Sequence, residues 1–262
     1  MNLSDGKLKK ILNNNFSGSS EILLELHRHL KNEQSIIFLF PEIIEIAKKQ
    51  FRSFQNIQKY LNELSKFSKS RKNLKTFFEH YDSVFEQSNL SLLNNAQKIL
   101  YPYSSFITIS NSKTVYDVLK SLSTSKRKLK IFVSESRPKL EGRILAKKLS
   151  LLSNVKVNLI TEAMMAGTLK KTEAAIIGAD SVLKNGDVVN KIGSLQLALL
   201  CKEMKIPFFV VADKNKFTKS KSFRQNKKPP TEIWRHISNK VTIENFYFEK
   251  VDSNLITRMI TD

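Results

Sequence analysis

The fold is decided by residues 105–136, which read SFITISNSKTVYDVLKSLSTSKRKLKIFVSES. This stretch begins with an apolar, β-branched run, Ser105–Ile109, which is typical of a buried strand. Lys113–Leu122 then carries apolar residues at helical spacing, and Leu129–Ser134 is a second short apolar run. Two such runs joined by a helix predict a βαβ unit, in which both strands are parallel and lie in one sheet.

The same alternation continues toward the C-terminus and predicts a larger parallel sheet of the Rossmann-like type. Such sheets bind ligands beyond the carboxyl ends of their strands. The polar residues that follow the predicted strands, among them Ser110, Asn111 and Asp180, are therefore candidate site residues. The further expected elements are a helix over Lys139–Leu152, strands over Val155–Ile160 and Ala174–Gly178, a helix over Gly193–Met204 and a fifth strand over Pro207–Ala212.

The N-terminal residues have a different pattern, which predicts a bundle of helices. No glycine interrupts residues 19–141, and the apolar residues of Ile22–Leu30 follow one another at three- and four-residue spacing. We expect Ser19 or Ser20 to cap this helix and Pro41 to lie in the first turn of the next one. The further expected helical segments are Ile43–Leu64, Leu74–Phe85 and Ser91–Leu100.

The pattern changes at Tyr101-Pro102, where the proline is expected to end the last helix. We therefore predict an α/β protein with an N-terminal helical domain over residues 1–102 and a Rossmann-like C-terminal domain over residues 103–262. The longest apolar run, Ile36–Phe40, is far too short for a membrane span. Met1–Asn15 lacks the apolar segment of a secretory signal, so we expect a cytoplasmic protein with no membrane partner.

Charge is the strongest compositional signal, because 44 Lys and Arg against 24 Asp and Glu give a formal net charge of +20. Nine basic residues and one acid, Glu232, fall within Lys214–Lys240. Such a segment can bind the phosphate groups of a small ligand or of RNA, or an acidic protein. The alternative is a solvated, lysine-rich surface, and no aromatic-rich pattern of single-strand binding accompanies the charge. Charge alone does not identify a partner.

Standard cofactor and metal motifs do not occur in the sequence. It holds no G-x-G-x-x-G, no G-x-x-x-x-G-K-[ST] and no G-x-S-x-G. The single cysteine, Cys201, excludes internal disulfides and multi-cysteine metal sites. His27 and His29 are two residues apart on a predicted helix and cannot face one metal, while His80 and His236 stand alone. We predict no metal and no cofactor, and structural or surface roles for the histidines.

Several segments of the second half together resemble one known family. They are Glu135-Ser136-Arg137-Pro138 followed by Glu141-Gly142, then Gly178-Ala179-Asp180, Asn190-Lys191-Ile192-Gly193-Ser194, Pro230–Trp234 and Asn245–Glu249. Their order and spacing are similar to those of the translation initiation factor 2B α/β/δ regulatory-subunit family. That superfamily also contains methylthioribose-1-phosphate isomerase and ribose-1,5-bisphosphate isomerase. The resemblance implies a Rossmann-like domain of the NagB/RpiA/CoA-transferase type, and it identifies the superfamily rather than the function.

The resemblance also implies which residues would be catalytic. The isomerases move a carbonyl from C1 to C2 of a phosphorylated sugar, using a cysteine after the first sheet strand and the aspartate of the G-A-D segment. This chain keeps Asp180 but has Ser110 at the position of the cysteine. A thiol, with a pKa of about 8.5, can be tuned to shuttle a proton near neutral pH, whereas a serine hydroxyl is a far weaker acid. Cys201 lies within a predicted helix and is expected to be a small buried side chain. Asp180 is either a sugar-binding carboxylate or a turn-forming residue.

The phosphate-binding residues implied by the resemblance are only partly kept. The isomerases share an N-terminal R-G-A segment, and the corresponding stretch here keeps Gly18 and lacks the arginine. Glu141 stands where the isomerases tend to have Gln, and its charge opposes a dianionic ligand unless Arg137 or Lys191 neutralises it. Asn190 precedes a predicted helix whose N-terminus could receive a phosphate. The candidate ligand-binding residues are therefore Gly18, Ser110, Asn111, Arg137, Glu141, Asp180, Asn190 and Lys191.

These features favour a non-catalytic protein similar to the initiation factor 2B regulatory subunits, with an inherited pocket for a sugar phosphate or a nucleotide. The resemblance implies homo-oligomers, most simply dimers, formed through the C-terminal domain, and partners among the initiation-factor subunits. One alternative is an aldose–ketose isomerase that acts on ribose 1,5-bisphosphate or methylthioribose 1-phosphate, with Asp180 as its catalytic residue. Another is a basic, RNA-associated protein that uses Lys214–Lys240.

Overall fold

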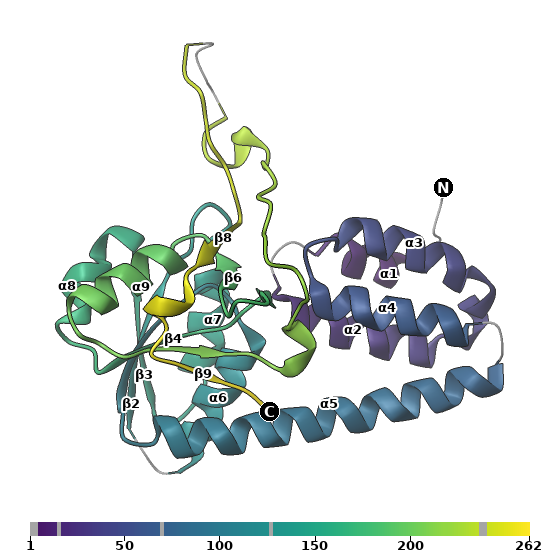
Figure 1. Cartoon of the computed structure of the whole chain (residues 1–262), viewed down its shortest axis with the longest axis horizontal. Coiled ribbons are helices and arrows are strands. Elements are labelled where there is room, and N and C mark those ends of the chain that lie inside the picture. The colour runs from purple at the N-terminus through teal and green to yellow at the C-terminus, as the bar shows by residue number, and fades with distance from the viewer. Residues whose placement is uncertain (1–4, 15–16, 69–70, 126–127, 236–239) are drawn as a thin grey trace.

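The computed structural model describes residues 5–14, 17–68, 71–125, 128–235 and 240–262, and its helices and strands form a helical part and a sheet part (Figure 1). Apolar residues from five α-helices meet in one buried core in the helical part, which confirms the predicted N-terminal bundle. Its elements are α1 (Gly6–Leu12), α2 (Ser19–Asn32), the 3-10 helix η1 (Gln34–Leu39), α3 (Phe40–Gln50), α4 (Gln55–Phe67) and the first turns of α5 (Arg71–Leu100).

Two details of the bundle differ from the sequence prediction. The N-cap of α2 is Gly18, and neither Ser19 nor Ser20 caps the helix with its side chain. A Cβ on Gly18 would lie 3.4 Å from the main-chain oxygen of Asn111, so the sheet part approaches the start of α2 closely. The predicted continuous period from residue 43 to 64 is broken into α3 and α4 by a turn at residues 51–54. Pro41 does lie in the first turn of α3, as predicted.

Helix α5 is a single helix of 30 residues where two were predicted. No glycine or proline interrupts residues 85–91, and most of the side chains there are exposed on the helix surface rather than forming a loop. The start of α5 packs in the bundle through Leu74–Tyr81, and its end packs against the sheet part through Leu92–Leu100. In Figure 1 it runs beneath both parts and ends before Pro102. Because one helix belongs to both cores, the division into domains at residue 102 stays a prediction.

The sheet part confirms the predicted α/β class. Its parallel strands are β1 (Ser105–Ile109), β2 (Leu129–Ser134), β3 (Val155–Ile160), β4 (Ala174–Ile177), β7 (Phe208–Val211) and β9 (Arg258–Ile260). They form one six-stranded sheet in the order β3-β2-β1-β4-β7-β9. The helices that connect them are α6 (Lys113–Thr124), α7 (Glu141–Ser150), α8 (Met165–Leu169) and α9 (Ser194–Glu203), with the 3-10 turns η2 (Glu162–Met164) and η5 (Ser253–Leu255).

Alternate residues of the strands enter two different cores. Phe106 and Ile131 point to the face covered by α6, α7 and the end of α5, whereas Ile107 and Phe132 point to the face covered by α8 and α9. Both faces of the sheet are therefore buried, as expected for a parallel sheet with crossover helices. The five predicted strands are all present, and β1, β2 and β3 have the predicted bounds. The short sixth strand, β9, was not predicted.

A small antiparallel sheet stands beside the large one and was not predicted either. It comprises β5 (Ser181–Val182), β6 (Val188–Lys191) and β8 (Phe248–Val251), in the order β5-β6-β8. A turn at Asn185-Gly186 connects β5 to β6, and Gly186 has a φ of 86°, which favours glycine. Strand β6 ends at Lys191, so this sheet places two candidate site residues near the edge of the large sheet.

The basic segment Lys214–Lys240 leads into a projecting arm. After η3 (Lys214–Lys216) the chain leaves the body, passes η4 (Pro230–Glu232) and returns to β8 (Figure 1). We call residues 218–235 and 240–247 the arm. Seven basic side chains of this segment are exposed, Lys228 is half-buried and Lys216 is buried. Among the helices in the described part of the chain, none combines the length and the apolar character that a bilayer crossing requires.

Candidate functional site

The carboxyl ends of β1 and β4 bring most of the predicted site residues together. They surround two small, adjoining cavities of about 70 Å³ and 30 Å³. Gly18, Ser110 and Asp180 line both cavities, so the start of α2 closes over the sheet edge. The residues that line one or the other are Asn111, Glu141, Asn190 and Lys191.

Arg137 is the predicted site residue that lies elsewhere. Its side chain is exposed, and it lines neither cavity. The preceding residue, Ser136, is held by its main-chain N–H, which donates to Glu162 Oε1 at 2.6 Å. Of the two residues expected to neutralise Glu141, Lys191 does so and Arg137 does not.

Ser110 occupies a constrained turn directly after β1. Its φ is 64°, in the left-handed region, and its main-chain N–H donates to Ser136 Oγ at 2.7 Å. Ser110, like Gly18 and Asp180, lines both cavities, so this turn places it where they adjoin. Among the described residues that line these cavities, no histidine is present to take a proton from the hydroxyl.

Asp180 is partly buried, and two buried lysines lie near it. Its main-chain N–H donates to Val189 O at 2.9 Å, which fixes the loop between β4 and β5 against β6. Burial raises the pKa of the Asp180 carboxyl above its usual range, against the opposing charges of Lys216 and Lys191. The carboxyl therefore combines two features of a proton-transfer group, an enclosed position and nearby cations.

Lys191 and Glu141 form a buried ion pair at the centre of the site. The Lys191 side chain is 8% exposed and the Glu141 side chain 2% exposed. The Lys191 ammonium also lies 4.8 Å from the centre of the Tyr247 ring and 5.4 Å from that of Phe248, both of which belong to the base of the arm and β8. Two aromatic faces and one carboxylate thus compensate the charge of Lys191.

The position of Glu141 depends on the glycine that follows it. A Cβ on Gly142 would lie 1.7 Å from the main-chain oxygen of Ser134, so only glycine allows α7 to start this close to the end of β2. The N–H of Gly142 donates to the oxygen of Glu135 at 3.1 Å across the same contact. Packing therefore requires glycine at position 142, because only then does Glu141 reach the sheet edge.

The N-terminus of α9 is already occupied by a side chain of this protein. Leu195 N–H donates to Glu249 Oε1 at 2.8 Å, and the main-chain N–H groups of Gly193 and Ser194 also lower the pKa of the Glu249 carboxyl, against the larger effect of burial, which raises it. Asn190 Nδ2 donates to Ser194 Oγ at 2.9 Å, so the Asn190 amide supports the same turn. A phosphate bound here, as the sequence suggested, would have to displace Glu249.

Sequence reasoning missed the residues that close the site from outside. Phe54 of the helical part packs its ring against Phe248 at 5.8 Å, and Lys59 Nζ donates to Phe217 O at 2.7 Å. Lys228 of the arm lies 4.8 Å from the centre of the Tyr247 ring and lines the larger of the two cavities. Tyr247 and Phe248 belong to the closing segment that carried the resemblance, but nothing in their pattern indicated that they face Lys191.

Three residues singled out in the sequence have structural roles. His27 Nε2 donates to Asp82 Oδ1 at 2.9 Å, and Tyr60 Oη donates to His27 Nδ1 at 3.2 Å, which describes a neutral, buried histidine. His29 Nε2 lies 2.6 Å from Asp5 Oδ2.

Cys201 is buried in α9, where burial raises the pKa of its thiol to about 12. His80 is exposed on α5, and His236 lies outside the described residues. Over the described ranges, no three His, Cys, Asp or Glu side chains gather to hold a metal ion.

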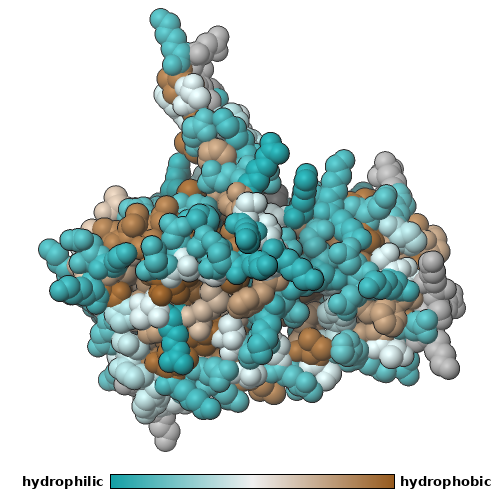
Figure 2. All heavy atoms as spheres, in the orientation of Figure 1, coloured by the Kyte–Doolittle hydropathy of each residue, from teal (hydrophilic) through white to brown (hydrophobic). Residues whose placement is uncertain are grey.

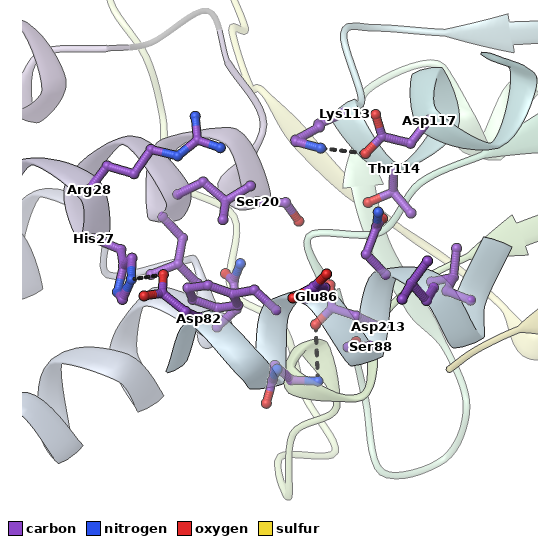
Figure 3. Close-up of a pocket in the computed structure, with 18 residues that line it drawn as sticks. Ser20, His27, Arg28, Asp82, Glu86, Ser88, Lys113, Thr114, Asp117 and Asp213 are labelled. Atoms are coloured by element: carbon purple, nitrogen blue, oxygen red, sulfur yellow. Dashed lines mark hydrogen bonds and ion pairs between the residues drawn. The ribbon is translucent and has the colours of Figure 1, made fainter. Parts of the chain in front are cut away.

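A much larger cavity, of about 490 Å³, opens between the helical part and α6 (Figure 3). It shares Ser20 and Lys113 with the smaller of the two site cavities, so it is their neighbour. No sequence pattern indicates this cavity, because its walls come from α2, α5, α6 and the loop after β7 and meet only when the two parts pack together.

Comparison with solved structures places this architecture among initiation-factor proteins. The crystal structure of the Pyrococcus horikoshii translation initiation factor eIF-2B matches 97% of this chain and 93% of its own, with a TM-score of 0.77 and 26% sequence identity. The similarity thus covers the helical part, the sheet part and their packing.

Sequence relatives include both initiation-factor-like proteins and sugar-phosphate isomerases. An eIF-2B subunit 2-like translation initiation factor of Pyrococcus furiosus is 29% identical over 88% of this chain and 80% of its own length. A methylthioribose-1-phosphate isomerase of Synechocystis is 31% identical over 57% of this chain, but the matched part is only 46% of that enzyme. The Initiation factor 2 subunit family matches residues 23–262 of this chain. This protein therefore belongs to the initiation factor 2 subunit (IF-2B) family.

Proposed function

We propose that this protein is a non-catalytic, cytoplasmic member of the IF-2B family that acts in assembly or regulation, as eIF-2B-like subunits do, rather than as an isomerase. The observation that carries this proposal is the composition of the cleft at the ends of β1 and β4. Ser110 stands at the acid position, and Glu141 is paired with the lysine that a phosphate would need.

The reaction of the isomerase relatives requires a group that gives and takes a proton near neutral pH. The Ser110 hydroxyl does not titrate in that range, and the described residues around it supply no histidine to activate it. The main-chain N–H of Ser110 is already bonded to Ser136 Oγ. Sugar isomerisation needs two proton-transfer groups, and this cleft supplies only one, the Asp180 carboxyl.

The cleft is also poorly suited to a phosphorylated sugar. Cavities of about 70 Å³ and 30 Å³ are far below the roughly 300–1,000 Å³ typical of small-molecule sites. The Glu141 carboxylate repels a phosphate dianion at the position of Lys191, and the Glu249 carboxylate takes the N–H groups at the start of α9. A sugar phosphate or a nucleotide would bind here only if the helical part or the arm moved away from the sheet edge.

The test is to restore the two missing features and compare the variants with the native protein. Native protein, Ser110→Cys and the double variant Ser110→Cys/Glu141→Gln are incubated with ribose 1,5-bisphosphate and with methylthioribose 1-phosphate. We expect no product from the native protein and, if any variant turns over, turnover only in the double variant. Product formed by the native protein would contradict the proposal, and circular dichroism of each variant checks that it is folded.

Isomerase activity is the second candidate function, and one observation favours it. The Asp180 carboxyl is partly buried near Lys216 and Lys191, and burial raises its pKa, which is the environment of a carboxylate that exchanges protons. Turnover by the native protein that disappears in Asp180→Asn would support this candidate over the first.

We also propose that the protein forms homodimers through the sheet part. Met164 and Leu199, on η2 and α9, are 54% and 52% exposed, and Figure 2 shows hydrophobic residues gathered over the region of α8 and α9. Contact between two copies would cover such a surface. The test is light scattering after size exclusion of Leu199→Lys, which should be monomeric, against Leu90→Lys, an equally exposed leucine of α5 that should leave a dimer intact. A native protein that runs as a monomer would contradict the proposal.

A further inference from the structure

The arm carries a positive charge that the protein itself does not compensate. Seven of its described residues are basic and only two, Glu232 and Glu244, are acidic. Both carboxylates are engaged within the chain, since Lys139 Nζ lies 2.6 Å from Glu232 Oε1 and Lys227 Nζ lies 2.9 Å from Glu244 Oε1. The exposed basic side chains of the arm that form no ion pair with any described residue are Lys219, Lys221, Arg224 and Arg235. The arm therefore favours an anionic partner.

The distribution of these charges separates a polyanion from a small anion. They follow one another along a segment that projects from the body of the protein (Figure 1). A small anion is held where several polar groups converge on one point. Charges that are spread along a segment instead match a chain of phosphates, in which successive groups each meet a basic side chain. The arm is thus suited to an extended polyanion.

The fold leaves the one tryptophan of the chain exposed on the same arm. Trp234 is 52% exposed, and its neighbours Ile233 and Arg235 are exposed as well. Unpaired nucleic-acid bases stack on such a ring, and a guanidinium beside the ring strengthens the interaction. The bases of a duplex are already stacked on one another, so they do not reach a side chain in this way. The exposed ring therefore favours a single strand among the possible polyanions.

Contacts at the base of the arm hold this surface in place before a partner arrives. Tyr247 Oη donates to Glu232 Oε1 at 2.6 Å, and Asn245 Nδ2 donates to Glu232 Oε2 at 3.0 Å. The main-chain N–H of Trp234 donates to Pro230 O at 3.2 Å. A surface that is ordered in advance loses less entropy on binding. We propose that the arm binds a single-stranded nucleic acid, with phosphates along its basic side chains and a base stacked on Trp234.

The experiment follows the fluorescence of Trp234 in the full chain, because the sequence holds no other tryptophan. The probes are oligo(U) and oligo(dT) of about 12 nucleotides, and an abasic phosphodiester strand of the same length and charge. We expect a base-bearing strand to quench the emission and to bind about tenfold more tightly than the abasic strand, since only bases stack. The more tightly bound of oligo(U) and oligo(dT) identifies whether RNA or DNA is the preferred strand. The result does not depend on whether the cleft is catalytic.

Two matched variants locate the binding. Trp234→Ala removes the exposed ring of the arm, whereas Phe38→Ala removes a ring that is 77% exposed on the helical part. With labelled oligo(U) and fluorescence anisotropy, we expect Trp234→Ala to weaken binding about tenfold and Phe38→Ala to leave it unchanged. Equal affinity of the native protein for oligo(U) and the abasic strand, or equal affinity of the native protein and Trp234→Ala for oligo(U), would overturn the proposal. A blue shift of the emission with phosphatidylglycerol vesicles, without a response to either base-bearing strand, would overturn it in favour of a membrane surface.

Discussion

The Lys191 ammonium is paired with the Glu141 carboxylate at the carboxyl edge of the sheet, and both side chains are buried. A buried pair of this kind compensates each charge only while both partners are present. The charge of Lys191, which could otherwise attract a phosphate, is therefore neutralised within the chain itself. Because of this ion pair, the cleft does not offer a free cation to a phosphate, although the sequence has Asp180, Asn190 and Lys191 as the resemblance implied.

Replacing Glu141 by Gln should destabilise the protein and create a phosphate site. The uncompensated Lys191 should lower the free energy of unfolding by about 3 kcal/mol. Inorganic phosphate should restore part of this loss in Glu141→Gln and have little effect on the native protein, because an anion that binds only the folded state stabilises it. The measurement is urea unfolding with and without phosphate.

Glu79→Gln, which loses an exposed pair with Lys75, should change stability by less than about 1 kcal/mol. Equal phosphate effects on all three proteins would argue against an internal counter-ion.

Gly142→Ala should be strongly destabilising, since its Cβ would overlap the main-chain oxygen of Ser134. We expect a loss of about 3 kcal/mol in the free energy of unfolding, at the upper end of the cost of overpacking. Gly167→Ala is the control, because a Cβ there meets nothing within 4 Å and alanine is favoured in a helix by up to about 1 kcal/mol. Thermal unfolding of both variants gives the comparison. A Gly142→Ala variant as stable as Gly167→Ala would mean that α7 does not start against β2 as described.

His27 should make stability depend on pH below neutrality. Burial lowers the pKa of His27 from its usual 6.5, against the opposing effect of Asp82, so the unfolded chain binds this proton more readily than the folded one. Stability is therefore fully present above pH 6.5 and falls as the pH drops from there toward the lower folded pKa. Asp82 has a lowered pKa and adds its own loss only in more acidic solution, below its usual 3.8.

The variant His27→Gln removes this titration, so its unfolding free energy should change less than that of the native protein between about pH 7 and pH 5. His80→Gln, at an exposed position, should keep the native slope. Urea unfolding at several pH values measures both slopes. Identical slopes in the native protein and His27→Gln would rule out His27 as the source.

The arm allows a direct test of the RNA alternative. If RNA binds along it, affinity should fall steeply with salt, by a slope of about 0.7 in log–log units for each phosphate contact on a single strand. Replacing the exposed Lys221 and Arg224 by Ala should reduce that slope by about 1.4. Fluorescence anisotropy with a labelled single-stranded RNA at several salt concentrations measures it. A slope that the double variant leaves unchanged would place any RNA elsewhere, and affinity independent of salt would exclude an electrostatic arm.

The sequence predicted the large sheet well because its signals are local. β1 and β2 are short, largely buried apolar runs, and β3 is a half-exposed edge strand whose β-branched residues mark it equally well. Ser110 follows β1 and Asp180 follows β4, so both lie at one edge of the sheet, since parallel strands end on the same side. α5 was divided in two because its middle is polar, yet a polar stretch without glycine or proline continues a helix when both ends are anchored in a core.

The contacts that decide the chemistry of the cleft were not predictable to the same degree. Glu249 is 56 residues from Gly193 along the chain, and only the pairing of β6 with β8 brings its carboxylate to α9. The burial of Lys191 under Tyr247 and Phe248 likewise requires β8 and the base of the arm. Arg137 was expected in the site because of its neighbours in sequence, but the turn after β2 leaves its side chain exposed.

The central claim is that this cleft no longer supports isomerisation, and phosphorus NMR of the reaction mixture tests it most directly. The native protein, folded and at high concentration, is incubated with ribose 1,5-bisphosphate and, separately, with methylthioribose 1-phosphate. We predict that only the resonances of the added aldose phosphate persist. Resonances of the ketose phosphate that grow with time in the native sample, and not in an Asp180→Asn sample, would contradict the account.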